Sequence, residues 1–179
     1  MVEIKLVPVT SAEEEKFIKE IQEAFQTSFE QEFGPSEGKI LPEADIRQSF
    51  ESAGSEAFFA VENGQKVGGL VLVIDEKTGC NHLDFLYVKV GCQSKGLGQA
   101  IWQAVEHLHP ETKVWETHTP YYEKRNIHFY VNRCGFQIVE FFNSSHLDPH
   151  APAGQLGALP VEIGKDFFRF EKLMKPSEK

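Results

Sequence analysis

The stretch "VKVGCQSKGLGQAIW", residues 88–102, joins an apolar strand to a helix through a loop of small and polar residues. Successive backbone N–H groups between Gln93 and Gly98 can point to one centre, and the following helix adds the positive end of its dipole. Gly96 and Gly98 let the backbone approach an anion with no Cβ in the way. The segment therefore predicts a site for a phosphate group, with Lys95 adding a screened charge at its rim.

Two common nucleotide-binding loops do not fit this segment. A P-loop requires Lys and then Ser or Thr after its glycine, whereas Leu97 and Gly98 follow Gly96 here. A dinucleotide-binding fingerprint requires a third Gly or Ala, and Ile101 stands at that position. The loop therefore argues against hydrolysis of a nucleoside triphosphate.

Hydrophobic periodicity and turn residues predict an alternation of strands and helices along the whole chain. Ser11 and Glu14 have the spacing of a capping box, which would open the first helix. The order of elements predicts an α+β fold in one domain, residues 1–179, with a parallel crossover around the glycine loop. The expected strands are 3–9, 56–62, 66–74, 82–90, 112–119, 136–142 and 166–174, and the expected helices are 11–33, 42–50, 96–109 and 123–135.

Charge and composition exclude several classes of partner. The net charge of −9 argues against nucleic acid and anionic membranes, and no apolar run approaches the ~18 residues of a membrane span. Three cysteines without a CxxC pair, and no secretory signal at the amino end, predict a cytoplasmic protein. The pattern His146-x-Asp148-x-His150 lacks a further ligand at a telling spacing, so no metal site is predicted.

Two motifs together resemble a known family. Gln93-x-x-Gly96-x-Gly98, with a strand before it and a helix after it, resembles the pyrophosphate loop of the GCN5-related N-acetyltransferase (GNAT) family. "NIHFYVNRCGF", residues 126–136, resembles the second family motif, a helix that ends in an aromatic residue, Tyr and Gly-Phe. The resemblance covers nearly the whole chain. It implies a mixed, mostly antiparallel twisted sheet of about seven strands with four helices, in which strands 4 and 5 splay apart.

The resemblance implies acetyl-CoA as the cofactor. In the family, pantetheine pairs with the open edge of the splayed strand, which gives Leu86, Tyr87 and Val88 main-chain contacts and makes the Val88 N–H the oxyanion donor. Asn126 is carried over although the family's usual Asn position falls on Lys124. The remaining expected contacts are Gln93, Ser94, Lys95, Gly96, Leu97, Gly98 and Gln99 in the loop and Phe129 and Tyr130 in the later helix.

Three side chains are candidates for the base that deprotonates the acceptor amine. By the resemblance, Glu116 stands where several bacterial relatives place a base or a residue that holds a water molecule, and His82 stands where some carry a catalytic glutamate. Asp84 lies on the same strand as His82, and His118 is nearby on the strand of Glu116. An imidazole of ordinary pKa could take the proton directly or through water, so the choice among the three candidates stays open.

The acid that protonates the leaving thiolate is where the chain departs from the family. The usual Tyr lies four residues before the Gly, a position that Val131 occupies here, while Tyr130 is one residue earlier. One residue is ~100° around a helix. Either the helix end is adjusted by one residue and Tyr130 is the acid, or Tyr130 only packs and water protonates the thiolate. Tyr121 and Tyr122 are alternative hydroxyls or pocket walls.

The predicted function is N-acetyl transfer from acetyl-CoA to a primary amine of a small molecule or peptide, by direct attack in a ternary complex. The alternative is an acyl-CoA-binding module with little or no turnover, which the departure at Val131 favours. The long segment 143–165 is expected either to cover the acceptor site or to contact a second subunit, so a homodimer stays an alternative to a monomer.

Overall fold

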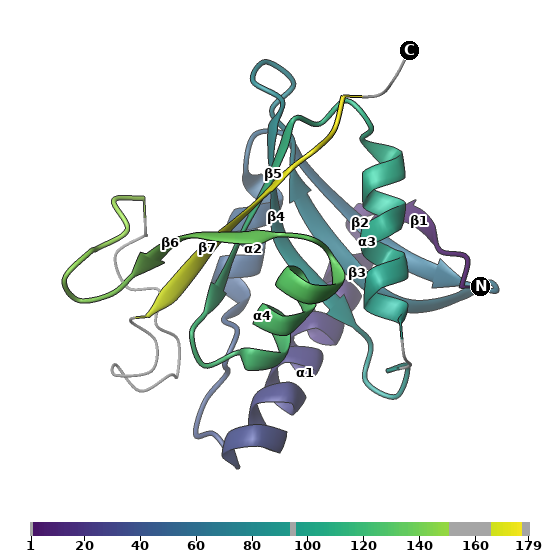
Figure 1. Ribbon diagram of the computed structural model, residues 1–179. Helices are drawn as coiled ribbons and strands as arrows, with labels where there is room; N and C mark the ends of the chain where they lie inside the picture. The colour runs from purple at the N-terminus through teal and green to yellow at the C-terminus, as the bar shows by residue number, and fades with distance from the viewer. Residues whose placement is uncertain (1, 94–95, 151–165, 177–179) are drawn as a thin grey trace.

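The computed structural model describes residues 2–93, 96–150 and 166–176. Seven strands form one sheet in the order β1-β2-β3-β4-β5-β7-β6, in which only β4 and β5 are parallel neighbours (Figure 1). This architecture confirms the predicted fold class. The strands are β1 (Lys5–Pro8), β2 (Ser55–Glu62), β3 (Gln65–Val73), β4 (Cys80–Val88), β5 (Val114–Pro120), β6 (Gln137–Phe142) and β7 (Phe167–Leu173).

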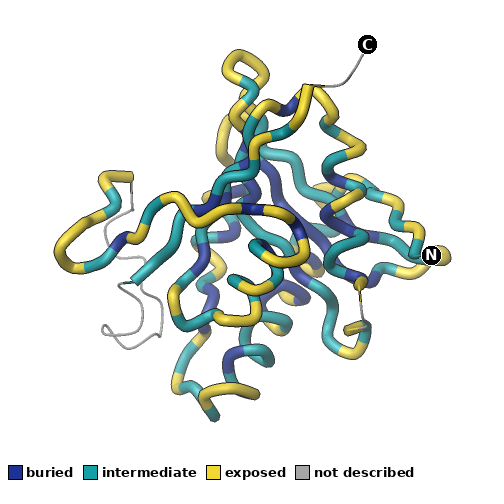
Figure 2. The backbone as a smooth tube through the Cα atoms, in the orientation of Figure 1, coloured by how far each residue is buried: buried dark blue, intermediate teal, exposed yellow. Residues whose placement is uncertain are grey.

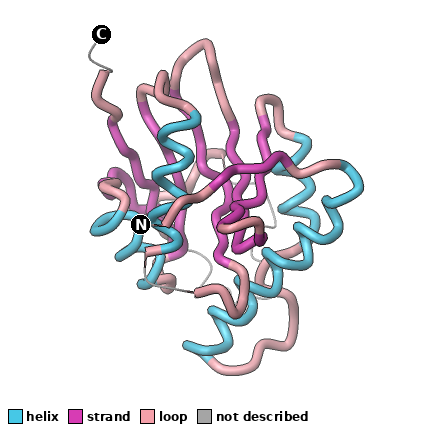
Figure 3. The backbone as a smooth tube through the Cα atoms, turned by 90° about the vertical axis from the view of Figure 1, so that its right-hand side faces the viewer, coloured by secondary structure: helices cyan, strands magenta, loops and turns pink. Residues whose placement is uncertain are grey.

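Helices cover both faces of the sheet, as the two views at right angles show (Figures 1 and 3). One face carries α1 (Glu14–Phe33) and α2 (Glu43–Glu51); the other carries α3 (Leu97–Leu108) and α4 (Lys124–His128), which continues into a π-helical turn, η2 (Phe129–Arg133). Within the described ranges, no helix combines the length and apolar character needed to cross a bilayer.

Alternation along the central strands builds a separate apolar core on each face. On β3, Leu70 and Leu72 pack in the cluster that contains Trp102 of α3, whereas Val71 between them packs in the cluster that contains Phe17 of α1. The buried positions follow the central strands and the inner sides of the helices (Figure 2). Burial on both faces fixes the register of these strands, because a slip of one residue would exchange the two cores.

The predicted capping box at the start of the first helix is wrong. Ser11 lies inside a 3-10 turn, Ser11–Glu13, that precedes α1. The Glu13 N–H donates to the Thr10 carbonyl at 2.9 Å, and the Thr10 hydroxyl donates to the Glu13 carboxylate at 3.0 Å. The chain therefore turns into the helix one residue earlier than the capping box requires.

The pairing of β4 with β5 is short. It consists of Cys80 opposite Val114, Asn81 opposite Trp115 and His82 opposite Glu116. Beyond these pairs β4 continues along β3 while β5 continues along β7, and the two strands diverge (Figure 1). A bulge at Asp84 accompanies the divergence, since Leu72 of β3 is opposite Leu83 and Val71 is opposite Phe85. The predicted splay of strands 4 and 5 is confirmed.

Candidate active site

Among the residues that the structure describes, no strand pairs with the edge of β4 that faces away from β3 beyond the bulge. The Lys89 N–H donates to the Val67 carbonyl at 2.8 Å, and peptide groups alternate in direction along an antiparallel strand. The peptide groups of Leu86 and Val88 therefore face the side away from β3, which the predicted main-chain contacts require. Those of Tyr87 face β3 instead, and its buried hydroxyl donates to Glu20 at 3.0 Å, so the predicted main-chain contact of Tyr87 has to be corrected.

The glycine loop ends in a free helix start. Gly96 is the N-cap of α3 with a φ of 89°, a conformation that costs other residues roughly 1–2 kcal/mol. The first turn of α3 has N–H groups that no helical carbonyl can pair; at this turn Gly96 is exposed, Gly98 is half-buried and Leu97 is buried. Ser94 and Lys95, two of the predicted contacts, lie outside the described residues.

Gly98 has a packing role that the sequence did not indicate. A Cβ at this position would lie 3.1 Å from the ring of Phe129, so the glycine lets the end of α4 approach α3. Gln99 strengthens the same contact, because its side-chain amide donates to the Arg133 carbonyl at 3.0 Å. Gln93 lies in the loop, where its side-chain oxygen accepts from the Gly91 N–H at 3.2 Å.

The end of the fourth helix is adjusted by one residue. In η2 the Cys134 N–H donates to the Phe129 carbonyl, five residues back, at 3.0 Å. Such a turn accommodates one residue more than an α-helical turn. Tyr130 consequently points inward and is 7% exposed, so the helix end is adjusted by one residue in this chain. The role of Tyr130 as the acid stays a prediction. Asn126, on α4, is half-buried.

Tyr130 lies beside the point where β4 and β5 part. Its ring packs against Phe136 and Phe170, and the Thr117 hydroxyl of β5 lies near its own hydroxyl. The Thr117 hydroxyl donates to the Leu83 carbonyl of β4 at 2.9 Å, across the start of the gap. Burial raises the pKa of the Tyr130 hydroxyl, and the Thr117 hydroxyl opposes part of this rise.

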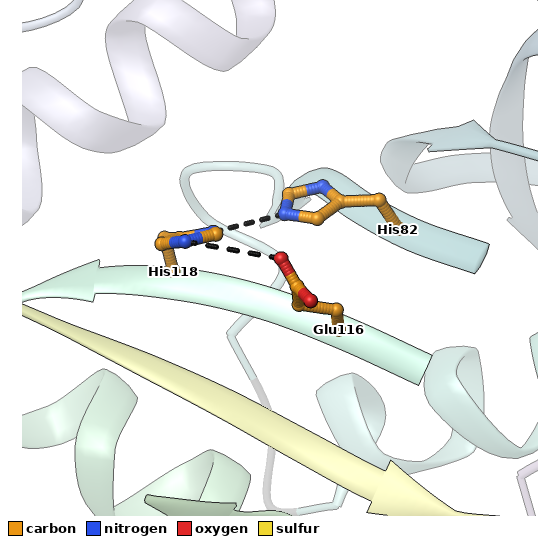
Figure 4. A group of neighbouring side chains, drawn as sticks. All are labelled: His82, Glu116 and His118. Atoms are coloured by element: carbon orange, nitrogen blue, oxygen red, sulfur yellow. Dashed lines mark hydrogen bonds and ion pairs between the residues drawn. The ribbon is translucent and has the colours of Figure 1, made fainter. Parts of the chain in front are cut away.

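The other side of the sheet carries a hydrogen-bonded chain of basic and acidic side chains. Asp84 Oδ1 lies 2.6 Å from His82 Nδ1, and His82 Nε2 lies 2.9 Å from His118 Nδ1. His118 Nε2 is in turn 3.9 Å from Glu116 Oε1 (Figure 4). Ser49 of α2 donates to the second oxygen of Asp84, which places this chain on the face of α1 and α2. The structure therefore brings all three predicted base candidates together.

The order of hydrogen bonds assigns the protons of the two histidines. The Asp84 carboxylate only accepts, so His82 carries its proton on Nδ1 and accepts at Nε2 from the Nδ1–H of His118. This leaves a lone pair on His118 Nε2. Burial, followed by the neighbouring His82, lowers the pKa of His118, while Glu116 and Asp148 oppose the shift. The lowered pKa favours the neutral form of His118, which is the form that can accept a proton.

Two contributors to this chain were not among the predicted site residues. His118 could have been found, since residues two apart on a strand, such as Glu116 and His118, share a face. Arg169 could not, because it comes from β7; its guanidinium donates to Glu116 Oε2 at 3.3 Å and also bonds to Glu140 and Glu171.

Aromatic side chains border the same side. Phe25 of α1 lies 6.2 Å from Phe85 of β4, centroid to centroid, and Tyr122 lies 5.7 Å from Phe29 of α1 in an edge-on arrangement. Burial raises the pKa of the Tyr122 hydroxyl, whereas Tyr121 is exposed. Of the two tyrosines named as alternatives, Tyr122 therefore has the position of a wall residue.

Comparisons with known proteins agree with this geometry. The chain matches the model of the Acetyltransferase (GNAT) family over residues 18–136. It is 43% identical over 165 residues to YrkN, an uncharacterized protein of Bacillus subtilis (strain 168), covering 91% of this chain and 89% of that protein.

Two of the solved structures that match show the same fold at low sequence identity. One is a Bacillus subtilis acetyltransferase in complex with CoA, with a TM-score of 0.64 and 16% identity over 98% of this chain and 100% of that chain. The other is a spermidine N-acetyltransferase from Vibrio cholerae in complex with CoA and spermine, with a TM-score of 0.64 and 12% identity over 97% of each chain.

Deletion of the exposed Asn132 tests whether η2 absorbs one extra residue. The deletion should convert η2 into an α-helical turn with Tyr130 still buried, at a cost of about 1 kcal/mol or less in the free energy of unfolding. Deletion of the equally exposed Gln103 from α3 is the matched control. It should cost more than about 3 kcal/mol, because it rotates one half of a buried helix face away from the core. Urea unfolding measures both; equal losses would contradict the interpretation.

Proposed function

Because the chain belongs to the acetyltransferase (GNAT) family, we propose that it transfers the acetyl group of acetyl-CoA to a primary amine of a small molecule or peptide. The transfer takes place by direct attack within a ternary complex. The observation that carries the proposal is the gap between β4 and β5. Tyr130 lies on one face of the sheet beside this gap, and the hydrogen-bonded series of side chains that runs from Asp84 through the two histidines to Glu116 lies on the other face.

The open edge of β4 and the start of α3 hold the donor. Pantetheine pairs with the peptide groups of Leu86 and Val88 as an added strand would. The diphosphate lies at the start of α3, near the N–H groups of Gly96, Leu97 and Gly98, where the helix dipole favours an anion. The CoA bound to both structures of the same fold supports this assignment. Catalysis comes chiefly from positioning the amine against the thioester.

His118 accepts the proton of the amine. Its Nε2 has the free lone pair, and the hydrogen bonds through His82 to Asp84 stabilise the positive charge that the ring acquires. Glu116, the strongest candidate from the sequence, is ion-paired with Arg169 and therefore holds or orients the amine. The deprotonated amine then attacks the thioester carbonyl, and the Val88 N–H donates to the oxyanion.

Tyr130 donates a proton to the leaving thiolate. The raised pKa keeps the phenol protonated at neutral pH, as a general acid must be at the start of the reaction. A route through an acetylated cysteine is disfavoured at Cys134, because burial raises the pKa of this thiol to about 12 and leaves little thiolate.

The alternative function, an acyl-CoA-binding module without turnover, rested on Val131 standing at the usual Tyr position. With Tyr130 turned inward, no structural observation on the described residues favours it over the enzyme. The homodimer stays a prediction; the edge strand β6 exposes Ile138, Val139 and Phe141.

A CoA release assay with a panel of amines tests the function directly. The panel should include polyamines, peptide amino termini, lysine side chains and aminoglycosides, because the sequence leaves all four open. At least one amine should release CoA above the hydrolytic background, with the acetylated amine found by mass spectrometry. Tight binding of acetyl-CoA without turnover across the panel would establish the binding module instead.

Tyr130→Phe removes the proposed acid and keeps the packing of its ring. With the best amine of the panel, kcat should fall by roughly 10²-fold, while the Kd for CoA stays unchanged, since the hydroxyl serves the leaving group. Tyr121→Phe alters an exposed tyrosine of the neighbouring loop and should leave kcat unchanged. If kcat of Tyr130→Phe equals that of the unaltered enzyme, water is the acid.

Asp84→Asn tests the orientation of the histidine chain. The uncharged amide no longer fixes the proton on His82 Nδ1, because it can present its NH₂ group as well as its oxygen to this atom. It also lacks the negative charge that stabilises the protonated His118, so kcat should fall by roughly 10²-fold. Asp75→Asn, in the turn before β4, is the matched control and should have little effect. An unchanged kcat for Asp84→Asn would leave Glu116 as the base.

A further inference from the structure

The strands β4 and β5 converge three metal-binding side chains on one point. His82 comes from β4, and Glu116 and His118 come from β5; their side chains point toward one another (Figure 4). Each offers one ligand atom such that these atoms all lie within 4.8 Å of one another. The three residues are half-buried rather than fully exposed, so their rotamers are restricted by the surrounding protein.

The donor atoms suit a particular class of ion. Two imidazole nitrogens and one carboxylate oxygen form the ligand set of many zinc sites that keep an open fourth position, and they suit other late divalent transition metals. Two ligands on one tetrahedral zinc ion lie roughly 3.3 Å apart. The facing nitrogens of His82 and His118 are 2.9 Å apart, so a few tenths of an ångström of separation is enough.

The polar atoms that would not bind the ion already have partners. The Asp84 carboxylate lies 2.6 Å from His82 Nδ1, which leaves Nε2 facing the cluster. Arg169 donates to Glu116 Oε2 at 3.3 Å, which leaves Oε1 facing His118. Partners of this kind orient metal ligands and typically contribute 10–100-fold to metal affinity.

The charge around the cluster favours a cation. Besides the ligand Glu116, four carboxylates lie near the cluster: Asp84 and Asp148 beside the histidines, and Glu140 and Glu171 on Arg169, which is the cationic side chain that the described contacts place among them. The Arg169 guanidinium is shared by Glu116, Glu140 and Glu171, so it neutralises only part of their charge.

We propose that His82, Glu116 and His118 form a binding site for a divalent transition-metal ion such as Zn²⁺. The proposal departs from the sequence prediction of no metal site, because the ligands come from two strands that are adjacent only in the fold. The consequence for activity rests on the proposed function: an ion bound to His118 Nδ1 shifts the ring proton to Nε2. This removes the lone pair that accepts the proton of the amine, and the ion lies where the amine must approach. The ion therefore inhibits acetyl transfer in competition with the amine.

Titration calorimetry with ZnCl₂ on the untagged full chain tests the site. The unaltered protein should bind one Zn²⁺ per chain. His82→Ala and His118→Ala should each bind at least tenfold more weakly. His107→Ala, at an exposed histidine of α3, and Cys80→Ser, at an exposed thiol, should bind as the unaltered chain does. The proposal would be overturned if both alanine variants bound Zn²⁺ as tightly as the unaltered chain does. It would also be overturned if the unaltered chain bound no Zn²⁺ at millimolar concentration.

Glu116→Gln keeps the test decisive if an alanine variant does not fold. It preserves the shape of the side chain and replaces the carboxylate ligand with an amide. Zn²⁺ should raise the thermal unfolding midpoint of the unaltered chain through preferential binding to the folded state. The increase should be much smaller for Glu116→Gln; an equal increase in both proteins would contradict the site.

Acetyl transfer provides a separate measurement. Zn²⁺ should raise the KM for the amine without lowering kcat, and EDTA should restore the original KM. Binding of Zn²⁺ by a chain that acetylates no amine would leave the metal site standing and refute the proposed function. Acetyl transfer by a chain that binds no Zn²⁺ would support the proposed function and refute the metal site.

Discussion

The short parallel pairing between β4 and β5 is the constraint on which the candidate site depends. After the pair His82–Glu116, each strand follows its other neighbour, β3 or β7, and the peptide groups on the facing edges lose their partners. Buried backbone groups need partners, so an edge of this kind is stable only where water or a ligand can pair with it. The Thr117 hydroxyl closes the first position by bonding to Leu83. What remains is an open strand edge with a different side-chain chemistry on each face of the sheet.

The π-helical turn shows how one residue can separate a motif from its geometry. Counted along the sequence, Tyr130 is out of register with the Gly-Phe pair that ends the motif. The five-residue hydrogen bond from Cys134 to Phe129 takes up the difference, so both ends of the helix keep their places in the core. The residues before and after the extra residue are both packed in the core. An α-helical continuation would rotate one of these two parts by ~100° relative to the other and remove its side chains from the core.

The face of α1 and α2 combines a base with an excess of negative charge, and the two properties are linked. Carboxylates that orient His82 and His118 also create a field that attracts any cation, whether an ammonium group or a metal ion. A protonated amine neutralises part of this negative charge only until it gives up its proton, whereas a divalent ion keeps its positive charge. The arrangement that would prepare an amine for attack is therefore also one that a transition metal can occupy.

The sequence by itself determined the family, the enzyme class and most of the fold, and the family match and the structure confirm these predictions. These features follow from local requirements: glycines in a phosphate loop, the Asn63–Gly64 hairpin with positive φ at both residues, and apolar periodicity. Other features were decided by tertiary structure. The direction of the Tyr130 side chain depends on how the end of its helix packs against the core. The role of Gly98 depends on its contact with Phe129. The ion pair of Glu116 with Arg169 depends on the pairing of β5 with β7. Such contacts join segments far apart in the chain, and no local pattern encodes the distance between them.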